Sequence, residues 1–247
     1  IRLLLAGNLT LFLFLLNVRV TLITLTAIPL SLGITILAAE DVDRTAIEGQ
    51  ADRIFNMLVA RPDLINAIEE SGIEGRVIPA GERITSVPDY ADLYEEYPGT
   101  DWDRRGRSFP GTEALPVFSG AEENLLCSTE DRYEGEDIFV RTFALTIRRF
   151  ALDAVDEGTS AAINRAYARA IAAGLWENTL AEINDDEYWM EGVQSYFDAN
   201  REDTDEDRGP NSSHNAVNTR DELAEYDPAL WAIAESVFGD TPWRPEC

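Results

Sequence analysis

The sequence has 247 residues, of which 46 are acidic and 20 are lysine or arginine, for a net charge of −26 at pH 7. It contains no lysine, so all 20 are arginines. Such a negative field makes nucleic acid and anionic membrane surfaces poor partners. The length suits one globular domain with an extra segment, or two small domains. A salty medium and a GC-rich genome would each account for this composition.

The first 38 residues form a hydrophobic segment with Arg2 and Arg19 as its charged residues and no acid. The stretch 20–38 is long enough to cross a bilayer as a helix, with both arginines on its inner side. The small residues Ala38 and Ala39 also fit the cleavage site of a long signal peptide. We therefore expect residues 1–39 to be a transmembrane or signal helix and residues 40–247 to be an extracytoplasmic domain, which is secreted, periplasmic or tethered to the membrane.

The hydrophobic stretch "LFLFLLNVRVTLITLTAIPLSLGITIL" resembles a transmembrane segment of the heavy-metal efflux pumps of the resistance-nodulation-division superfamily. The resemblance covers residues 1–38 only, and those pumps continue with further membrane helices. Because one span cannot build a transporter, it implies a gene fusion, a degraded gene or an assembly artefact.

The remaining chain predicts a mostly α, α+β fold. Apolar residues at helical spacing predict a helix pair over residues 45–72, in which Pro62 opens the second helix and Gly72 ends it. Residues 75–90 predict one or two short strands, and residues 95–120 predict an ordered loop. The further helices that we expect lie at 137–152, from a cap at Thr159 to Gly174, at 184–200, after a Thr219–Glu222 capping box, and from Asp227-Pro228 to Gly239.

The helix over residues 137–152 has one clearly apolar side, which favours a buried core helix. Arg141, Leu145 and Arg148 stack on another side at the spacing i, i+4 and i+7. Two histidines at i and i+4 around a glutamate, H-E-x-x-H, are the zinc site of many metallopeptidases. Here that spacing holds an arginine and a leucine.

"GEDIFVRTFALTIRR" resembles "GE-x-I-x-V-HEFAHTIH" of a secreted, gluzincin-type zinc metallopeptidase family related in fold to the anthrax lethal factor catalytic domain. The resemblance continues through "EENLLC", "EYWMEGVQSYFD", "HNAVNTRDELAEYDPALW" and "VFGDTPW", and it covers about residues 50–247. It implies a zincin-like metallopeptidase domain over most of the chain.

Carried over by position, the resemblance places Arg141 and Leu145 at the two histidines, Thr142 at the catalytic glutamate and Arg148 at a further histidine. Glu187 alone matches a zinc ligand. Arginine offers only donors and leucine has no lone pair, so neither can bind zinc. Zinc is the cofactor of the resembled family, and we expect none in this chain.

Glu191 lies one helical turn after Glu187 and is expected to support it, although both could form a solvated helix face. Arg141 would take the place of the zinc charge and pair with one of these glutamates. His214, the sole histidine, either lies near the cleft and contacts a ligand or is a loop histidine satisfied by hydrogen bonds.

Two further features concern the domain as a whole. Cys127 and Cys247 allow one disulfide if the domain is exported. The alternating acids of "DTDEDRG" (203–209) match a calcium loop only in part, and a solvated acidic loop is the simpler interpretation.

These observations predict a pseudopeptidase, which is a metallopeptidase-like domain with a disabled metal site that retains at most a cleft for peptide or protein binding. One alternative is an active zinc-dependent peptidase that uses other ligands. The other is a non-functional fusion with a transporter fragment.

Overall fold

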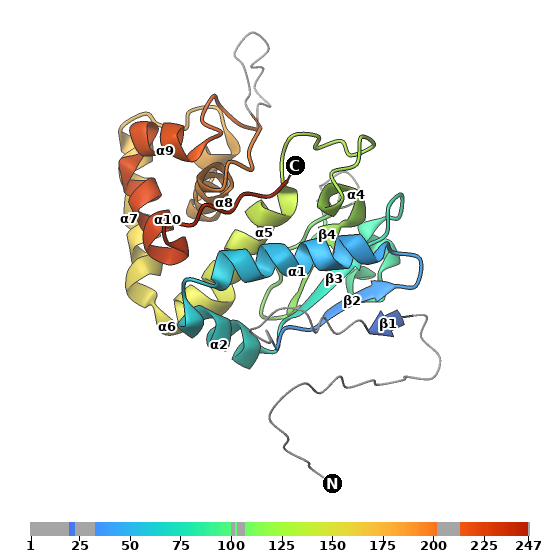
Figure 1. Ribbon diagram of the computed structural model, residues 1–247. Coiled ribbons are helices and arrows are strands. Elements are labelled where there is room, and N and C mark those ends of the chain that lie inside the picture. The colour runs from blue at the N-terminus through green and yellow to red at the C-terminus, as the bar shows by residue number, and fades with distance from the viewer. Residues whose placement is uncertain (1–19, 23–32, 100–101, 103–106, 202–212, 247) are drawn as a thin grey trace.

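A computed structural model describes residues 20–22, 33–99, 102, 107–201 and 213–246. Figure 1 shows a small sheet on one side of the molecule and a group of helices on the other, with helix α5 (Ile138–Ile147) between them. Helices α1 (Arg44–Leu58) and α5 both pack against the sheet. The chain is thus a helix-rich mixture of α and β structure.

The sheet has the strand order β1-β2-β3-β4. Strands β2, β3 and β4 are parallel, and β1 is antiparallel to β2. Because β4 directly precedes α4 and α5, the end of the sheet positions the start of the helix that carries the motif. The four strands are Val20–Leu22, Ile36–Ala39, Glu74–Ile78 and Val117–Ala121.

The prediction of a helix over residues 20–38 is wrong for the residues of this stretch that the structure describes. Val20–Leu22 and Ile36–Ala39 are strands, and β2 pairs with β3 of the domain. Ile36 and Ala38 are buried in the core, so these apolar residues serve the sheet. Residues 1–19 and 23–32 lie outside the described part, as does most of the transporter-like segment. Among the described residues, no helix combines the length and apolar character needed to cross a bilayer.

The predicted helix pair is confirmed as α1 and α2 (Pro62–Ser71). The Asp43 side chain accepts a hydrogen bond from Thr45 N and caps α1. Gly72 ends α2 with a φ of 68°, a left-handed conformation that costs glycine little.

The region expected to be a loop holds more structure than the sequence indicated. Residues 117–121 form β4, although the glycine and proline residues around them favour a loop. The described aromatic residues Trp102 and Phe109 are buried, as expected, and pack on Tyr90 and Leu93 in a small cluster beside the sheet. Three short helical turns precede β4 in the chain: η1 (Ile84–Ser86), η2 (Pro88–Tyr90) and α3 (Leu93–Glu96).

The motif helix is longer than α5 alone. It continues through a π-helical turn, η3 (Arg148–Leu152), into α6 (Asp153–Val155), which together match the predicted helix. π-helical turns are rare and occur often at functional positions. The short helix α4 (Glu122–Leu125) precedes it.

The C-terminal helices form the second half of the molecule. The cap of α7 is Asp156, which accepts from Thr159 N, so the expected cap at Thr159 is wrong by one turn. The Thr219–Glu222 capping box is confirmed, and so is the final helix that ends at Gly239. The elements are α7 (Glu157–Ala172), η4 (Leu180–Glu182), α8 (Asp185–Tyr196), α9 (Arg220–Tyr226) and α10 (Pro228–Phe238).

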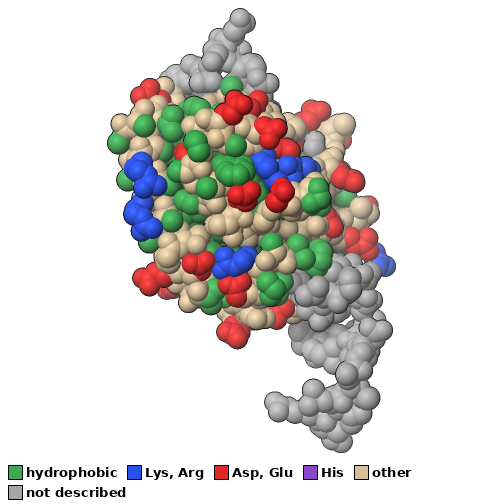
Figure 2. All heavy atoms as spheres, turned by 60° about the vertical axis from the view of Figure 1, so that its left-hand side comes forward, with side chains coloured by type: hydrophobic (Ala, Val, Ile, Leu, Met, Phe, Trp, Pro, Cys, Tyr) green, Lys and Arg blue, Asp and Glu red, His purple; other side chains and the backbone are tan. Residues whose placement is uncertain are grey.

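Charged side chains are scattered over the surface of this helical half, among apolar and uncharged groups (Figure 2). On the face shown in Figure 2, arginines lie next to carboxylates, with apolar side chains between them. Pairing of this kind offsets part of the self-repulsion of a strongly acidic chain.

Two glycines in helices allow a matched test of the packing. A Cβ built at Gly192 of α8 would overlap the buried side chain of Leu230 of α10, whereas one at Gly158 of α7 meets no atom closer than 3.7 Å. We expect Gly192→Ala to lower the free energy of unfolding by about 1–3 kcal/mol through overpacking. Gly158→Ala should raise it by up to about 1 kcal/mol. Urea unfolding measures both, and equal effects would contradict the close approach of α8 and α10.

Candidate functional site

The first turn of α5 is fixed by a buried aspartate. Asp137 Oδ1 accepts a hydrogen bond from Val140 N at 2.9 Å and caps the helix. Its Oδ2 accepts from Arg53 Nε of α1 at 2.5 Å, and both side chains are buried. This cap and ion pair hold α5 against α1. They therefore fix the backbone position from which the Arg141 side chain extends, one turn later.

Helix α8 carries the acidic side of the site. Asn184 caps it by accepting from Glu187 N at 2.8 Å, which places Glu187 in the first turn and Glu191 one turn later. Trp189 Nε1 donates to Ala144 O of α5 at 2.9 Å. This bond holds the two helices side by side with the glutamates facing Arg141.

Arg141 lies between the two glutamates, as predicted. Its Nη2 is 2.5 Å from Glu187 Oε2 and 3.8 Å from Glu191 Oε2. The Arg141 and Glu191 side chains are 8% and 0% exposed, so the cation faces two carboxylates almost out of water. The ion pair expected from the sequence is therefore confirmed, and Glu187 and Glu191 do not form a solvated face.

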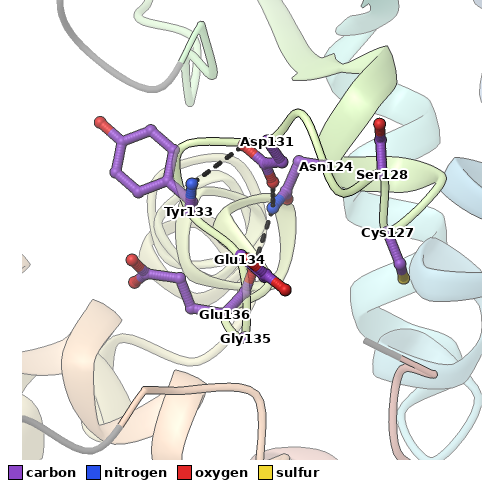
Figure 3. Close-up of a pocket in the computed structure, with 8 residues that line it drawn as sticks. All are labelled: Asn124, Cys127, Ser128, Asp131, Tyr133, Glu134, Gly135 and Glu136. Atoms are coloured by element: carbon purple, nitrogen blue, oxygen red, sulfur yellow. Dashed lines mark hydrogen bonds between the residues drawn. The ribbon is translucent and has the colours of Figure 1, made fainter.

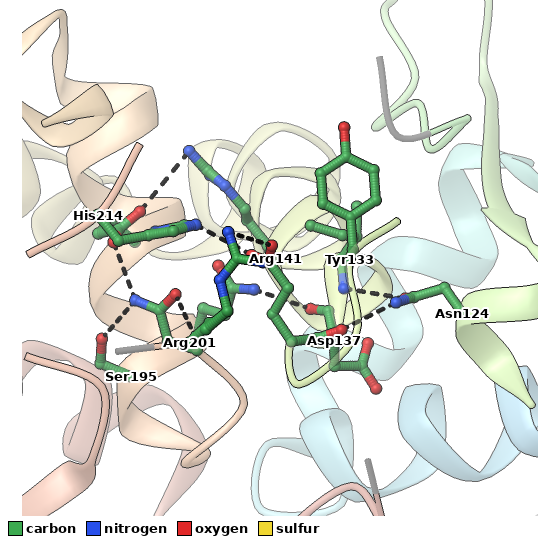
Figure 4. A network of polar contacts seen from close by, with 12 residues as sticks. Asn124, Tyr133, Asp137, Arg141, Ser195, Arg201 and His214 are labelled. Atoms are coloured by element: carbon green, nitrogen blue, oxygen red, sulfur yellow. Dashed lines mark hydrogen bonds and ion pairs between the residues drawn. The ribbon is translucent and has the colours of Figure 1, made fainter. Parts of the chain in front are cut away.

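His214 completes this network, which Figure 4 shows with His214 on one side, Asp137 and Asn124 on the other and Arg141 between them. Its Nδ1 lies 2.7 Å from Glu191 Oε1 and its Nε2 lies 3.0 Å from Glu136 Oε2. His214 thus has a hydrogen bond to Glu191 of α8 and an ion-pair contact with Glu136, as the second of the two alternatives expects.

The pKa values in the network follow from these contacts. Burial alone would lower the pKa of His214, but the hydrogen bonds and charges of Glu136 and Glu191 outweigh burial and raise it to about 9. Burial would raise the pKa of Glu191, but the hydrogen bond and charge of His214, followed by the charge of Arg141, lower it below its usual value. His214 is therefore a cation at neutral pH and Glu191 an anion.

A pocket of about 140 Å³ opens beside Glu136. Figure 3 shows its lining, in which Asn124 Nδ2 donates to Asp131 Oδ2 and to the Glu136 carbonyl. Arg201 Nη2 lies 3.9 Å from Glu136 Oε1. The lining residues are Asn124, Cys127, Ser128, Asp131, Tyr133, Glu134, Gly135 and Glu136.

The other positions of the motif have separate environments. Arg148 pairs with Asp185 and Asp186 at the start of α8, at 2.5 and 3.0 Å, and donates to Asn164 Oδ1, away from the Arg141 pair. Leu145 is buried. Thr142 is buried as well, with 8% of its surface exposed.

The donor set does not fit the zinc site of the resembled family. Of the three ligand positions, Arg141 and Leu145 have no lone pair to give, and the Glu187 carboxylate already pairs with Arg141. Within the described part of the chain, no group of three or more His, Cys, Asp or Glu side chains is arranged to hold a metal. No chemical step through zinc follows from these residues.

Two predictions fall partly or wholly outside the described residues. The first is the disulfide between Cys127 and Cys247, which stays a prediction because Cys247 lies outside the described residues. The acidic loop at 203–209 is the other.

Sequence reasoning missed several members of the network because they are distant in the chain. Arg53 is 84 residues from Asp137, and His214 comes 78 residues after Glu136. Only Asp137 carried a local signal, since an aspartate directly before a helical apolar run is a typical N-cap.

Comparison with known proteins supports the fold. No protein-family model matches the sequence, and no curated protein matches it. Among solved structures, the chain is similar to the Pro-Pro endopeptidase PPEP-2 from Paenibacillus alvei, with 11% identity and a TM-score of 0.53 over 82% of this chain and 96% of that one. The chain has a metallopeptidase-like fold. At this identity the likeness concerns the fold alone, and nothing in the comparisons bears on the transporter resemblance.

The buried ion pair gives a direct test of the site. We expect Arg141→Met to lower the free energy of unfolding by about 3 kcal/mol, because it leaves Glu187 and the buried Glu191 without a cation. Arg44→Met is the matched control, since the Arg44–Glu48 pair is 72% and 42% exposed and should cost less than about 1 kcal/mol. Urea unfolding at pH 7 measures both. Similar losses in the two variants would contradict a structural role for Arg141.

Proposed function

We propose that this domain is a pseudopeptidase that binds peptide or protein segments without hydrolysing them. One observation supports the proposal above the others. The guanidinium of Arg141 pairs with Glu187 at 2.5 Å, at the two positions where the resembled family holds its metal. A permanent cation then takes the place of a metal ion, and it has no exchangeable ligand and no bound water to activate.

The motif helix still offers hydrogen-bonding groups for a ligand. Among the residues that the structure describes, the buried Arg141 Nη1 has no acceptor, and the Thr142 hydroxyl follows it on α5. A buried donor without an acceptor costs free energy, which a bound ligand could recover. We infer that an acceptor from the ligand meets these two groups.

The charge around Arg141 favours a neutral ligand group. The three carboxylates of Glu136, Glu187 and Glu191 are already matched by three cations, Arg141, protonated His214 and Arg201. A ligand carboxylate would add another negative charge at this place, whereas a peptide carbonyl would not. We therefore propose an internal peptide segment as the ligand and not a chain terminus.

The location of the domain is part of the same proposal. Export, with or without a membrane anchor, is supported by the hydrophobic sequence that precedes strand β2. The fusion alternative predicts that genome reads across codons 30–50 fail to support the junction.

Restoring the motif tests whether the metal position was assigned correctly. The triple variant Arg141→His, Thr142→Glu and Leu145→His should bind one zinc ion per chain, because Glu187 then completes a three-ligand site. The control is Arg141→Gln, Thr142→Glu and Leu145→Gln, which removes the same side chains but adds no imidazole. Metal analysis of both proteins after dialysis decides the matter. A folded triple variant that binds no zinc would show that the positions do not correspond to the family's site.

Peptide binding can be tested with a single isosteric change. Peptides selected from a random displayed library should bind the domain, and Thr142→Val should weaken binding by about 2–10-fold through loss of one hydrogen bond. Thr45→Val, at an exposed position on α1, is the control and should leave the Kd unchanged. Failure to select any peptide, or equal affinities for wild type and Thr142→Val, would contradict the proposed ligand site.

A further inference from the structure

The His214 ring stands between two buried carboxylates, one on each ring nitrogen. Its side chain is 4% exposed, and those of Glu191 and Glu136 are 0% and 2% exposed. An ionised carboxylate only accepts hydrogen bonds, so a ring nitrogen can hydrogen-bond to it only as a donor. Only the imidazolium form carries an N–H on both nitrogens. Two buried carboxylates, at 2.7 and 3.0 Å from the two ring nitrogens, therefore favour the charged ring.

We propose that doubly protonated His214 is a clasp that holds loop 213–217 to the segment before α5, and that this clasp opens at Glu136 when the ring loses one proton. The inference does not rest on the proposed function. It concerns how the pocket beside Glu136 responds to pH.

The surroundings of the two carboxylates decide which side opens. Glu191 is fully enclosed and has two further partners, since Asn200 Nδ2 donates to it at 2.9 Å and Arg141 lies 3.8 Å away. Among the described residues, Glu136 has only Arg201 as a further cation, at 3.9 Å and with a side chain that is 51% exposed, and it lines the pocket. Loss of the Nε2 proton would place a lone pair against the Glu136 carboxylate, so this contact separates first.

The loop stays attached at its other contacts when the clasp opens. Leu180 N donates to Ser213 O at 3.0 Å, and Ser195 Oγ donates to Val217 O at 2.9 Å. Neither contact involves a group that titrates. The movement is therefore a local separation of residues 131–136 from His214, which widens the pocket.

The two carboxylates place the transition in the alkaline range. They raise the pKa of His214 from about 6.5 to about 9. A group whose pKa is raised on folding stabilises the fold fully below its unfolded pKa and loses that contribution as pH rises through the folded value. The clasp is thus closed at neutral pH and opens as pH rises through about 9.

Since the chain has one histidine, a single imidazole Cε1–H resonance reports its titration by NMR. We expect a midpoint near pH 9. Glu136→Gln should lower the midpoint by about one unit or more, because one of two adjacent charges is lost. Glu70→Gln removes an exposed charge on α2 and should leave it unchanged.

Hydrogen exchange, corrected for the intrinsic effect of pH, measures the opening itself. Backbone amides of residues 131–137 should lose protection over the pH range of the histidine titration, while those in the middle of α7 keep theirs. A midpoint near 6.5, a midpoint that Glu136→Gln does not move, or a titration without loss of protection at 131–137 would each overturn the proposal.

Discussion

The buried ion pair between Arg141 and Glu187 is the interaction on which the rest of this site depends. A guanidinium that is 8% exposed must have a compensating charge close by, because an isolated buried charge costs several kcal/mol. The compensating carboxylates come from α8. The ion pair therefore requires α5 and α8 to lie side by side, with the starts of the two helices fixed relative to each other. Asp137 and Asn184 provide those caps, and the Trp189–Ala144 bond fixes the spacing. A buried ion pair adds little stability compared with apolar packing, but removing one partner is expensive.

The pair is one part of a chain of alternating charges. Glu191 faces Arg141 on one side and His214 on the other, and Glu136 follows beyond the histidine. Each acid in this row has a cation within 4 Å, which is how a strongly acidic chain can keep carboxylates in its interior. In the zincin family that this chain resembles, one divalent metal ion would compensate the charge of the carboxylates. Here two side-chain cations from separate elements do so.

The fold was predictable where the signals are local. Helix periodicity, Pro62, Gly72 and the Thr219–Glu222 box depend on residues within one or two turns, and the structure has these elements where the pattern places them. The Arg141 pair was also predictable, since the resemblance places Arg141 at the metal position beside Glu187 and Glu191. Strand β4 was missed because its five residues are all buried, so that no polar alternation marks them, and turn-forming residues surround them. Strand β2 was missed because an apolar stretch looks the same whether it enters a bilayer or a sheet.

The network around Glu136 could not be predicted, since its members meet only when the chain is folded. Nothing near Glu136 in sequence indicates that a histidine 78 positions later would contact it, and Arg53 gives no sign of its aspartate on α5. Contacts of this kind set the chemistry of the site while leaving local propensity unchanged. The proposed function therefore depends on contacts that only the structure reveals, whereas the helices could be predicted from the sequence.

Titration of zinc into the purified, unsubstituted domain tests the central claim most directly. If Arg141 holds the metal's place, isothermal calorimetry should show no tight site of one zinc per chain, and zinc should not induce peptide hydrolysis. Stoichiometric, tight zinc binding that is abolished by Glu187→Gln, together with hydrolysis of a peptide, would contradict the account.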